Sequence, residues 1–176
     1  MKTISEVKPR KRYLKRIYLG IMLWVVGRAV QAAARADKDV RDEFSSMPDG
    51  YTFCLGAFPN GPYMIVGKDD TGKVRYLGSK KENHPVHLEM GLKSTGHLFT
   101  LFTFQESTPT ANARDRLFVS GDVPQACAAV RILDTVQVYL LPKPIARLAI
   151  KRYPRWPLKR HILTRTMVLV RTATGL

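Results

Sequence analysis

The stretch Arg116–Leu133, RLFVSGDVPQACAAVRIL, joins a predicted strand to a predicted helix through Gly121-Asp122. Such a corner either presents a phosphate to the N-terminus of a helix or is simply a packing corner. Phosphate-binding loops need several glycines, or a lysine followed by a hydroxyl residue, whereas a single glycine precedes an acid here. Asp122 would repel a phosphate, and with Pro124 and Gln125 behind it the pattern predicts a capping box. The corner therefore predicts packing rather than phosphate chemistry.

The segments before this corner predict a sheet. Residues 51–58, 62–69 and 73–80 read as three strands separated by short turn sequences, which favours an antiparallel meander. Residues 85–92 alternate apolar and polar side chains and predict a fourth strand, and 116–121 predicts the fifth. Helices are expected from about residue 17, after the cap Asp37, after the cap Ser94, and from Asp122 to about Leu141. We therefore expect an α+β fold in which helices cover a mainly antiparallel five-stranded sheet.

The positive charge is located at the two ends of the chain. The 176 residues carry a formal charge of +15, with seven basic residues and one acidic residue in 1–16, and nine basic residues and no acidic residue in 143–176. Residues 17–142 hold thirteen residues of each sign. The sequence thus divides into a basic N-terminal arm (1–16), one folded domain (17–142) and a basic C-terminal extension (143–176).

The N-terminal run is open to three interpretations. A membrane-spanning helix needs about 20 apolar residues, but Arg28 interrupts the run after eleven. A secretory signal remains an alternative, because a basic start, an apolar middle and a small-residue segment follow one another. The third interpretation is the first helix of the domain, which packs on a sheet or lies on a bilayer. Its apolar stripe consists of Leu14, Ile17, Tyr18, Ile21, Val25, Ala29 and Ala32.

Residue patterns for catalysis or metal binding are missing from the sequence. Cys54 and Cys127 have no CxxC spacing, and His84 and His87 would point to opposite faces of a strand. Serines lack a nucleophile-elbow context, and the carboxylates form no recognisable acid/base pair. We therefore expect no catalytic residue, metal or cofactor.

The predicted interior is strongly apolar. Such a set of side chains either forms a packed core or lines a cavity for an apolar ligand, because flexible Met and Phe side chains suit both. The expected ligand-lining residues are Phe53, Leu55, Met64, Val86, Leu88, Met90, Leu98, Leu101, Phe102, Phe118, Ile132, Val136, Tyr139 and Leu140.

The order of elements resembles the sterol carrier protein 2 superfamily over roughly residues 24–141. The stretches VHLEMGLKS and ARDRLFVSGDVPQACAAVRIL carry the likeness. The resemblance implies a small lipid-binding fold with an apolar tunnel between sheet and helices, and sterols, acyl chains or isoprenoid lipids as ligands. Some bacterial relatives are accessory factors of quinone biosynthesis. The basic arm and the extension depart from the simple family pattern and favour a carrier held at a membrane or in a complex.

We therefore expect a non-enzymatic lipid-binding protein that is cytoplasmic and peripheral to an anionic membrane, with export as the alternative. A structural subunit of a larger assembly and nucleic-acid binding through the basic ends are rival interpretations, the latter because aromatic residues alternate with cations. The expected docking residues are Lys11, Arg12, Lys15, Arg16, Trp24, Arg147, Lys151, Arg152, Arg155, Trp156, Lys159 and Arg160.

Overall fold

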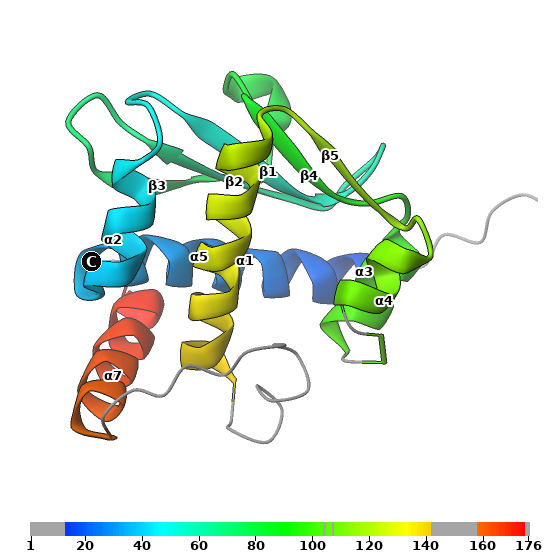
Figure 1. Ribbon diagram of the computed structural model, residues 1–176. Coiled ribbons are helices and arrows are strands. Elements are labelled where there is room, and N and C mark those ends of the chain that lie inside the picture. The colour runs from blue at the N-terminus through cyan, green and yellow to red at the C-terminus, as the bar shows by residue number, and fades with distance from the viewer. Residues whose placement is uncertain (1–12, 104, 107, 142–157, 175–176) are drawn as a thin grey trace, which may run out of the picture.

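The computed structural model describes residues 13–103, 105–106, 108–141 and 158–174 (Figure 1). The elements are α1 (Tyr13–Ala36), α2 (Lys38–Ser45), β1 (Thr52–Ala57), β2 (Tyr63–Lys68), β3 (Val74–Gly78), the short 3-10 helix η1 (Lys81–Asn83), β4 (Leu88–Leu92), α3 (Thr95–Phe102), α4 (Thr108–Ala113), β5 (Leu117–Ser120), α5 (Val123–Leu140) and α7 (Leu158–Thr174). The five predicted strands and the helices after Asp37, Ser94 and Asp122 are all confirmed.

The sheet is mixed, with strand order β3-β2-β1-β4-β5. The pairings β1–β2, β2–β3 and β4–β5 are antiparallel, whereas β1 and β4 are parallel, with Phe53 opposite Leu88 and Ala57 opposite Leu92. The sheet is thus mainly antiparallel, as expected, but mixed, because its central pair β1–β4 is parallel. The reason is the connection from β3 to β4, which carries the chain back across the sheet to the free side of β1.

The labelled α-helices lie beneath one face of the sheet, as Figure 1 shows. The helix α1 runs along this face and contacts β2, β3, α2, α3, α5 and α7. Gly27 makes the close crossing with β3 possible, because a Cβ atom there would lie 2.4 Å from Cδ2 of Tyr76. One turn further along α1, Oε1 of Gln31 accepts a hydrogen bond of 2.9 Å from the backbone N–H of Tyr76. The crossing thus holds the edge strand β3 against α1.

The first helix presents apolar side chains on two faces. Its buried face consists of Leu19, Leu23, Ala29, Val30 and Ala33, all 0% exposed. Of the predicted stripe, Ala29 and Ala32 lie in the core. Leu14, Ile17, Tyr18 and Ile21 are exposed instead, so the sequence stripe combines parts of two different faces.

Helix caps illustrate which local predictions hold. The Asp37 side chain accepts from the N–H of Asp39, and the Ser94 side chain accepts from the N–H of His97. Asp122 occupies the N-cap position of α5, but its side chain makes no capping hydrogen bond, and Oε1 of Gln125 is buried without a partner. The predicted capping box is therefore wrong, although the packing corner is in place.

The helix α7 lies within the segment 143–176 that the charge distribution sets apart. It packs against α1 and α5, with Val168 0% and Thr172 7% exposed. At least this part of the basic extension therefore contributes to the folded body.

Candidate functional site

Most of the predicted ligand-lining residues form the hydrophobic core between the sheet and the helices. Leu55, Leu101, Phe102 and Leu140 are half-buried at its margin. The fully enclosed members are Phe53, Met64, Leu88, Met90, Leu98, Ile132, Val136 and Tyr139.

The space between β4 and α5 is occupied by these side chains. Leu88, Ile132, Val136 and Tyr139 are each 0% exposed, so no cavity wide enough for a water molecule touches them. An open tunnel at this place stays a prediction, and it would require the side chains to move apart. Met64 and Met90, which line the same core, have the unbranched and adaptable side chains that such a movement needs.

Two predicted ligand-lining residues lie elsewhere. Phe118 pairs with Gly91 and lies on the face of the sheet that points away from the helices. The centre of its ring is 4.5 Å from the centre of the Phe58 ring, in an edge contact. Its neighbour Leu117 packs against the core instead, because successive strand residues point to opposite faces. Val86 precedes β4 and is half-buried outside the core cluster.

The helices α1 and α3 meet at the margin of the core. The rings of Tyr18 and Phe99 are in edge contact at 5.6 Å, and the Tyr18 hydroxyl donates to the carbonyl of Phe102 at 3.4 Å. The ammonium group of Lys15 lies 4.2 Å from the centre of the Phe99 ring. Leu98, on the same short helix, is 0% exposed. Apolar contacts therefore run without a break from the surface of α1 into the core.

The exposed face of α1 is the largest run of exposed apolar side chains on any described element. We call it the α1 stripe: Tyr13 63%, Leu14 83%, Ile17 58%, Tyr18 37%, Ile21 57% and Trp24 43% exposed. Its spacing of three and four residues places these side chains along one side of the helix. Of these six residues, Trp24 is an expected docking residue, and Leu14, Ile17, Tyr18 and Ile21 belong to the stripe that the sequence predicts to pack on a sheet or lie on a bilayer. Tyr13 belongs to neither set.

A groove of about 530 Å3 adjoins the α1 stripe. Trp24 and Arg16 line it from α1, and Lys80 and Lys81 line it from the loop after β3, with Glu82 as the acid in the lining. The Arg16 guanidinium donates to the carbonyl of Asn60 at 2.8 Å. Cations therefore border the apolar stripe, as they do in helices that lie in a lipid interface.

The remaining predicted docking residues divide by location. Lys15 and Arg16 are on α1, as described above. Lys159 and Arg160 lie in the first turn of α7. The residues outside the described part of the chain are Lys11, Arg12, Arg147, Lys151, Arg152, Arg155 and Trp156.

The surroundings of Cys54 and His87 indicate structural rather than catalytic roles. Burial raises the pKa of Cys54 to about 12, an effect that nearby Lys81 lowers and Glu89 raises, so this thiol stays protonated. Nδ1 of His87 lies within hydrogen-bond distance of the N–H and the hydroxyl of Thr52. Within residues 13–103, 105–106, 108–141 and 158–174, no group of three or more His, Cys, Asp or Glu side chains could hold a metal ion.

By length and hydropathy alone, α1 would be able to cross a membrane, but half of its apolar window is buried inside the protein. The core helix of a globular domain passes the same test. With Leu19, Leu23 and Val30 packed into the core, α1 is a core helix with one exposed apolar face.

No model of a known protein family matches the chain, and no curated protein matches it. Among solved structures, sterol carrier protein 2 from Yarrowia lipolytica in its apo form is 17% identical with a TM-score of 0.44, over 69% of this chain and 93% of that one. The UbiJ-SCP2 ubiquinone synthesis protein is 14% identical with a TM-score of 0.39, over 73% and 99%. The sterol carrier protein domain 2 of Helicoverpa armigera is 14% identical with a TM-score of 0.40, over 85% and 100%. The similarity to these three structures covers 69–85% of this chain.

Proposed function

We propose that this protein binds an apolar lipid of the sterol, acyl or isoprenoid class without catalysis, while docked on a membrane through the α1 stripe. The observation that carries the proposal is the continuity between the stripe and the core. Leu14 and Tyr18 are exposed, Phe99 and Phe102 are half-buried, and Leu98 is fully buried.

The lipid would enter between α1 and α3. Among the described residues, the ring contact and the long hydrogen bond of Tyr18 and the Lys15 ammonium over the Phe99 ring join α1 to α3, which also pack against each other. These contacts must break for α3 to separate from α1. An acyl or isoprenoid chain passing this junction would meet Leu55 and Leu101 at the margin of the core and would displace the flexible Met64 and Met90 behind them.

Membrane docking would combine apolar insertion with charge attraction. Each Lys or Arg near an anionic leaflet contributes about 1 kcal/mol, and Lys15, Arg16 and Arg28 flank or interrupt the exposed face of α1. Trp24 suits the headgroup level, where an amphipathic ring has one apolar and one wet side. Four further cations between residues 8 and 12 directly precede α1 in the sequence.

Lipid uptake by the full-length protein tests the proposal. The protein is incubated with phosphatidylcholine vesicles that contain phosphatidylglycerol together with cholesterol, oleic acid and ubiquinone, then separated from them and analysed by native mass spectrometry and lipid extraction. We expect one of the three apolar lipids to copurify in a fixed ratio to protein. Copurification of none of them above the level found with an unrelated basic protein would refute lipid binding.

A matched pair of variants locates the entry. Leu101→Gln places an amide at the junction of α3 with the core, and Leu77→Gln places one at a half-buried position of β3 outside the core cluster. We expect Leu101→Gln to reduce the lipid-to-protein ratio severalfold and Leu77→Gln to leave it unchanged. Equal ratios in the two variants would contradict entry at α3.

A comparison of binding to nucleic acid with binding to vesicles separates the rival function from the proposed one. If the protein acts on nucleic acid through its basic ends, binding to a single-stranded oligonucleotide would be tighter than binding to anionic vesicles and would not depend on the α1 stripe. That outcome would replace the lipid proposal.

A further inference from the structure

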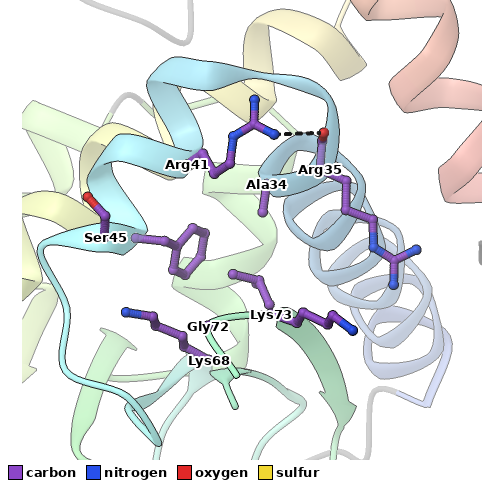
Figure 2. Close-up of a pocket in the computed structure, with 9 residues that line it drawn as sticks. Ala34, Arg35, Arg41, Ser45, Lys68, Gly72 and Lys73 are labelled. Atoms are coloured by element: carbon purple, nitrogen blue, oxygen red, sulfur yellow. Dashed lines mark hydrogen bonds between the residues drawn. The ribbon is translucent and has the colours of Figure 1, made fainter. Parts of the chain in front are cut away.

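A second hollow lies at the C-terminal end of α1, away from the groove beside Trp24. It has a volume of about 450 Å3. The helix α1, the helix α2 and the turn between β2 and β3 enclose it, as Figure 2 shows. Its lining is Ala34, Arg35, Arg41, Phe44, Ser45, Lys68, Gly72, Lys73 and Val74. Four of these nine residues are cations and none is an acid.

Three of the four cations lack a carboxylate partner in the described part of the chain. Lys68 pairs with Asp49 at 2.8 Å and donates to the carbonyl of Met47. For Arg35, Arg41 and Lys73 no ion pair occurs among the described residues, and Arg41 has only a long hydrogen bond of 3.5 Å to the backbone carbonyl of Arg35.

Asp69, which directly follows Lys68 in the sequence, is already engaged. The Asp69 carboxylate accepts from the hydroxyl and the N–H of Thr71 and from the N–H of Lys73, and it pairs with Arg75 at 3.4 Å. It therefore does not neutralise the hollow. Cations from three separate segments line one concavity, and among the described residues only Lys68 of the four has a carboxylate partner. A bound anion would reduce the repulsion among the other three.

The composition of the hollow indicates the class of anion. Two guanidinium groups and two ammonium groups suit a multiply charged phosphate, which arginine recognises through paired hydrogen bonds. The wall behind these cations consists of the apolar residues Ala34, Phe44 and Val74, which are 6%, 3% and 6% exposed. A ligand that carries both a phosphate and an apolar portion matches both parts.

Arg35, one of the two α1 residues that line the hollow, lies on the same side of α1 as the α1 stripe. Ile17, Trp24, Arg28 and Arg35 follow one another at steps of seven, four and seven residues, which keep them on one side of a helix. Arg35 is eleven residues beyond Trp24, a distance of about 16 Å along the axis at about 1.5 Å per residue. A bilayer that accepts the stripe would therefore bring its headgroups to Arg35, at the edge of the hollow.

We propose that this hollow, formed by Arg35, Arg41, Lys68 and Lys73, binds the phosphate headgroup of an anionic phospholipid. The proposal rests on the proposed membrane docking and adds a headgroup preference to it. Lipids with an exposed phosphomonoester, such as phosphatidic acid, fit best, because they present more than one negative charge to the four cations.

The test compares two vesicle types of equal surface charge, one with phosphatidic acid and one with phosphatidylserine, by cosedimentation of the full-length protein. We expect the wild type to bind the phosphatidic acid vesicles severalfold more tightly. In the variant Arg41→Gln/Lys73→Gln we expect a loss of about fivefold per cation, the equivalent of about 1 kcal/mol. For two cations this is roughly 25-fold on either vesicle type, and the preference for phosphatidic acid should also disappear, because the hydrogen bonds to its phosphate are lost.

A control variant, Lys80→Gln/Lys93→Gln, removes the same charge from exposed positions outside the hollow. It should weaken binding to both vesicle types alike and keep the preference. A wild type that binds both vesicle types equally, or a hollow variant that keeps the preference, would overturn the headgroup site. Thermal melting confirms that each variant is folded, as expected for exposed side chains.

A soluble probe separates failure of this site from failure of membrane docking. Binding of dihexanoyl phosphatidic acid and of glycerol 3-phosphate is followed by the NMR signals of Gly72 and its neighbours. If neither vesicle binds, the proposed docking fails. Binding of glycerol 3-phosphate as tight as that of the lipid would then assign the hollow to a free phosphate ester and overturn the lipid assignment.

Discussion

Replacing two isoleucines of the α1 stripe by serine measures how much of membrane docking is apolar. Ile17 and Ile21 are 58% and 57% exposed, and complete burial of such a side chain is worth about 1.5–3 kcal/mol. Insertion of the exposed part therefore contributes about 0.9–1.7 kcal/mol per residue, or about 1.7–3.4 kcal/mol for the pair. At about 1.4 kcal/mol per tenfold, Ile17→Ser/Ile21→Ser should weaken binding to anionic vesicles roughly 15- to 300-fold.

The helix itself should tolerate this change, because isoleucine and serine have similar helix propensities. Liposome cosedimentation at low and high salt gives the affinities, and the loss should persist at high salt because the apolar contribution is not screened. The matched control is Val123→Ser/Val130→Ser on α5, where the side chains are 68% and 44% exposed. Should the α5 variant lose as much affinity as the α1 variant, or the α1 variant lose less than threefold, docking through the stripe would be refuted.

Three further predictions concern the folded body. Tyr139→Phe removes the buried hydrogen bond from the Tyr139 hydroxyl to the Asp37 carboxylate and should lower the free energy of unfolding by about 1–3 kcal/mol, measured by urea denaturation; an unchanged midpoint would contradict a stabilising role. A thiol reagent should label the exposed Cys127 in the native protein and the buried Cys54 only after unfolding, which mass spectrometry of the labelled peptides checks. Burial raises the pKa of Asp134, so its negative charge opposes folding above that pKa; Asp134→Asn should raise the melting temperature at neutral pH, and the gain should vanish as the pH falls and the native carboxyl becomes protonated.

Local signals in the sequence predicted local structure well. The alternation in 85–92 placed β4, and the hydroxyl and carboxylate of Ser94 and Asp37 cap the helices that follow them. Asp122 shows where the same signal fails. Its backbone has the extended conformation of an N-cap, but its exposed side chain makes no hydrogen bond to the first turn of α5. The sequence therefore predicted that Asp122 occupies the N-cap position, but it did not predict the orientation of the Asp122 side chain.

Features that depend on distant pairing escaped the sequence. The residues of β1 do not indicate that its second neighbour in the sheet is the parallel strand β4, which is distant in the sequence. Assigning Phe118 instead of Leu117 to the interior is an error of one residue in β5, and in a strand such an error exchanges the two faces. The basic hollow was missed because Arg35, Arg41 and Lys73 belong to three segments that only the tertiary structure brings together.

The first helix was difficult for a different reason. Its apolar residues cover more than one face, so periodicity alone did not reveal whether Leu19 and Leu23 or Ile17 and Ile21 lie inside. Only contact with the sheet decides between them.

In the proposed docking, α1 is both a wall of the core and the face that contacts the bilayer, so its buried and its exposed apolar positions are both constrained. In a saturation mutagenesis scored separately for folding and for membrane binding, buried positions such as Leu23 should fail in both assays, whereas exposed positions such as Ile21 should fail only in the second. Gly20, which has no atom within 4 Å of the place a Cβ would take, should accept alanine in both. The depth of docking is limited in the same way: Leu19, Leu23 and Val30 hold α1 in the core, so the helix cannot leave the sheet to follow its exposed face into the hydrocarbon. Docking through α1, as proposed, would therefore be at the membrane surface rather than across the bilayer.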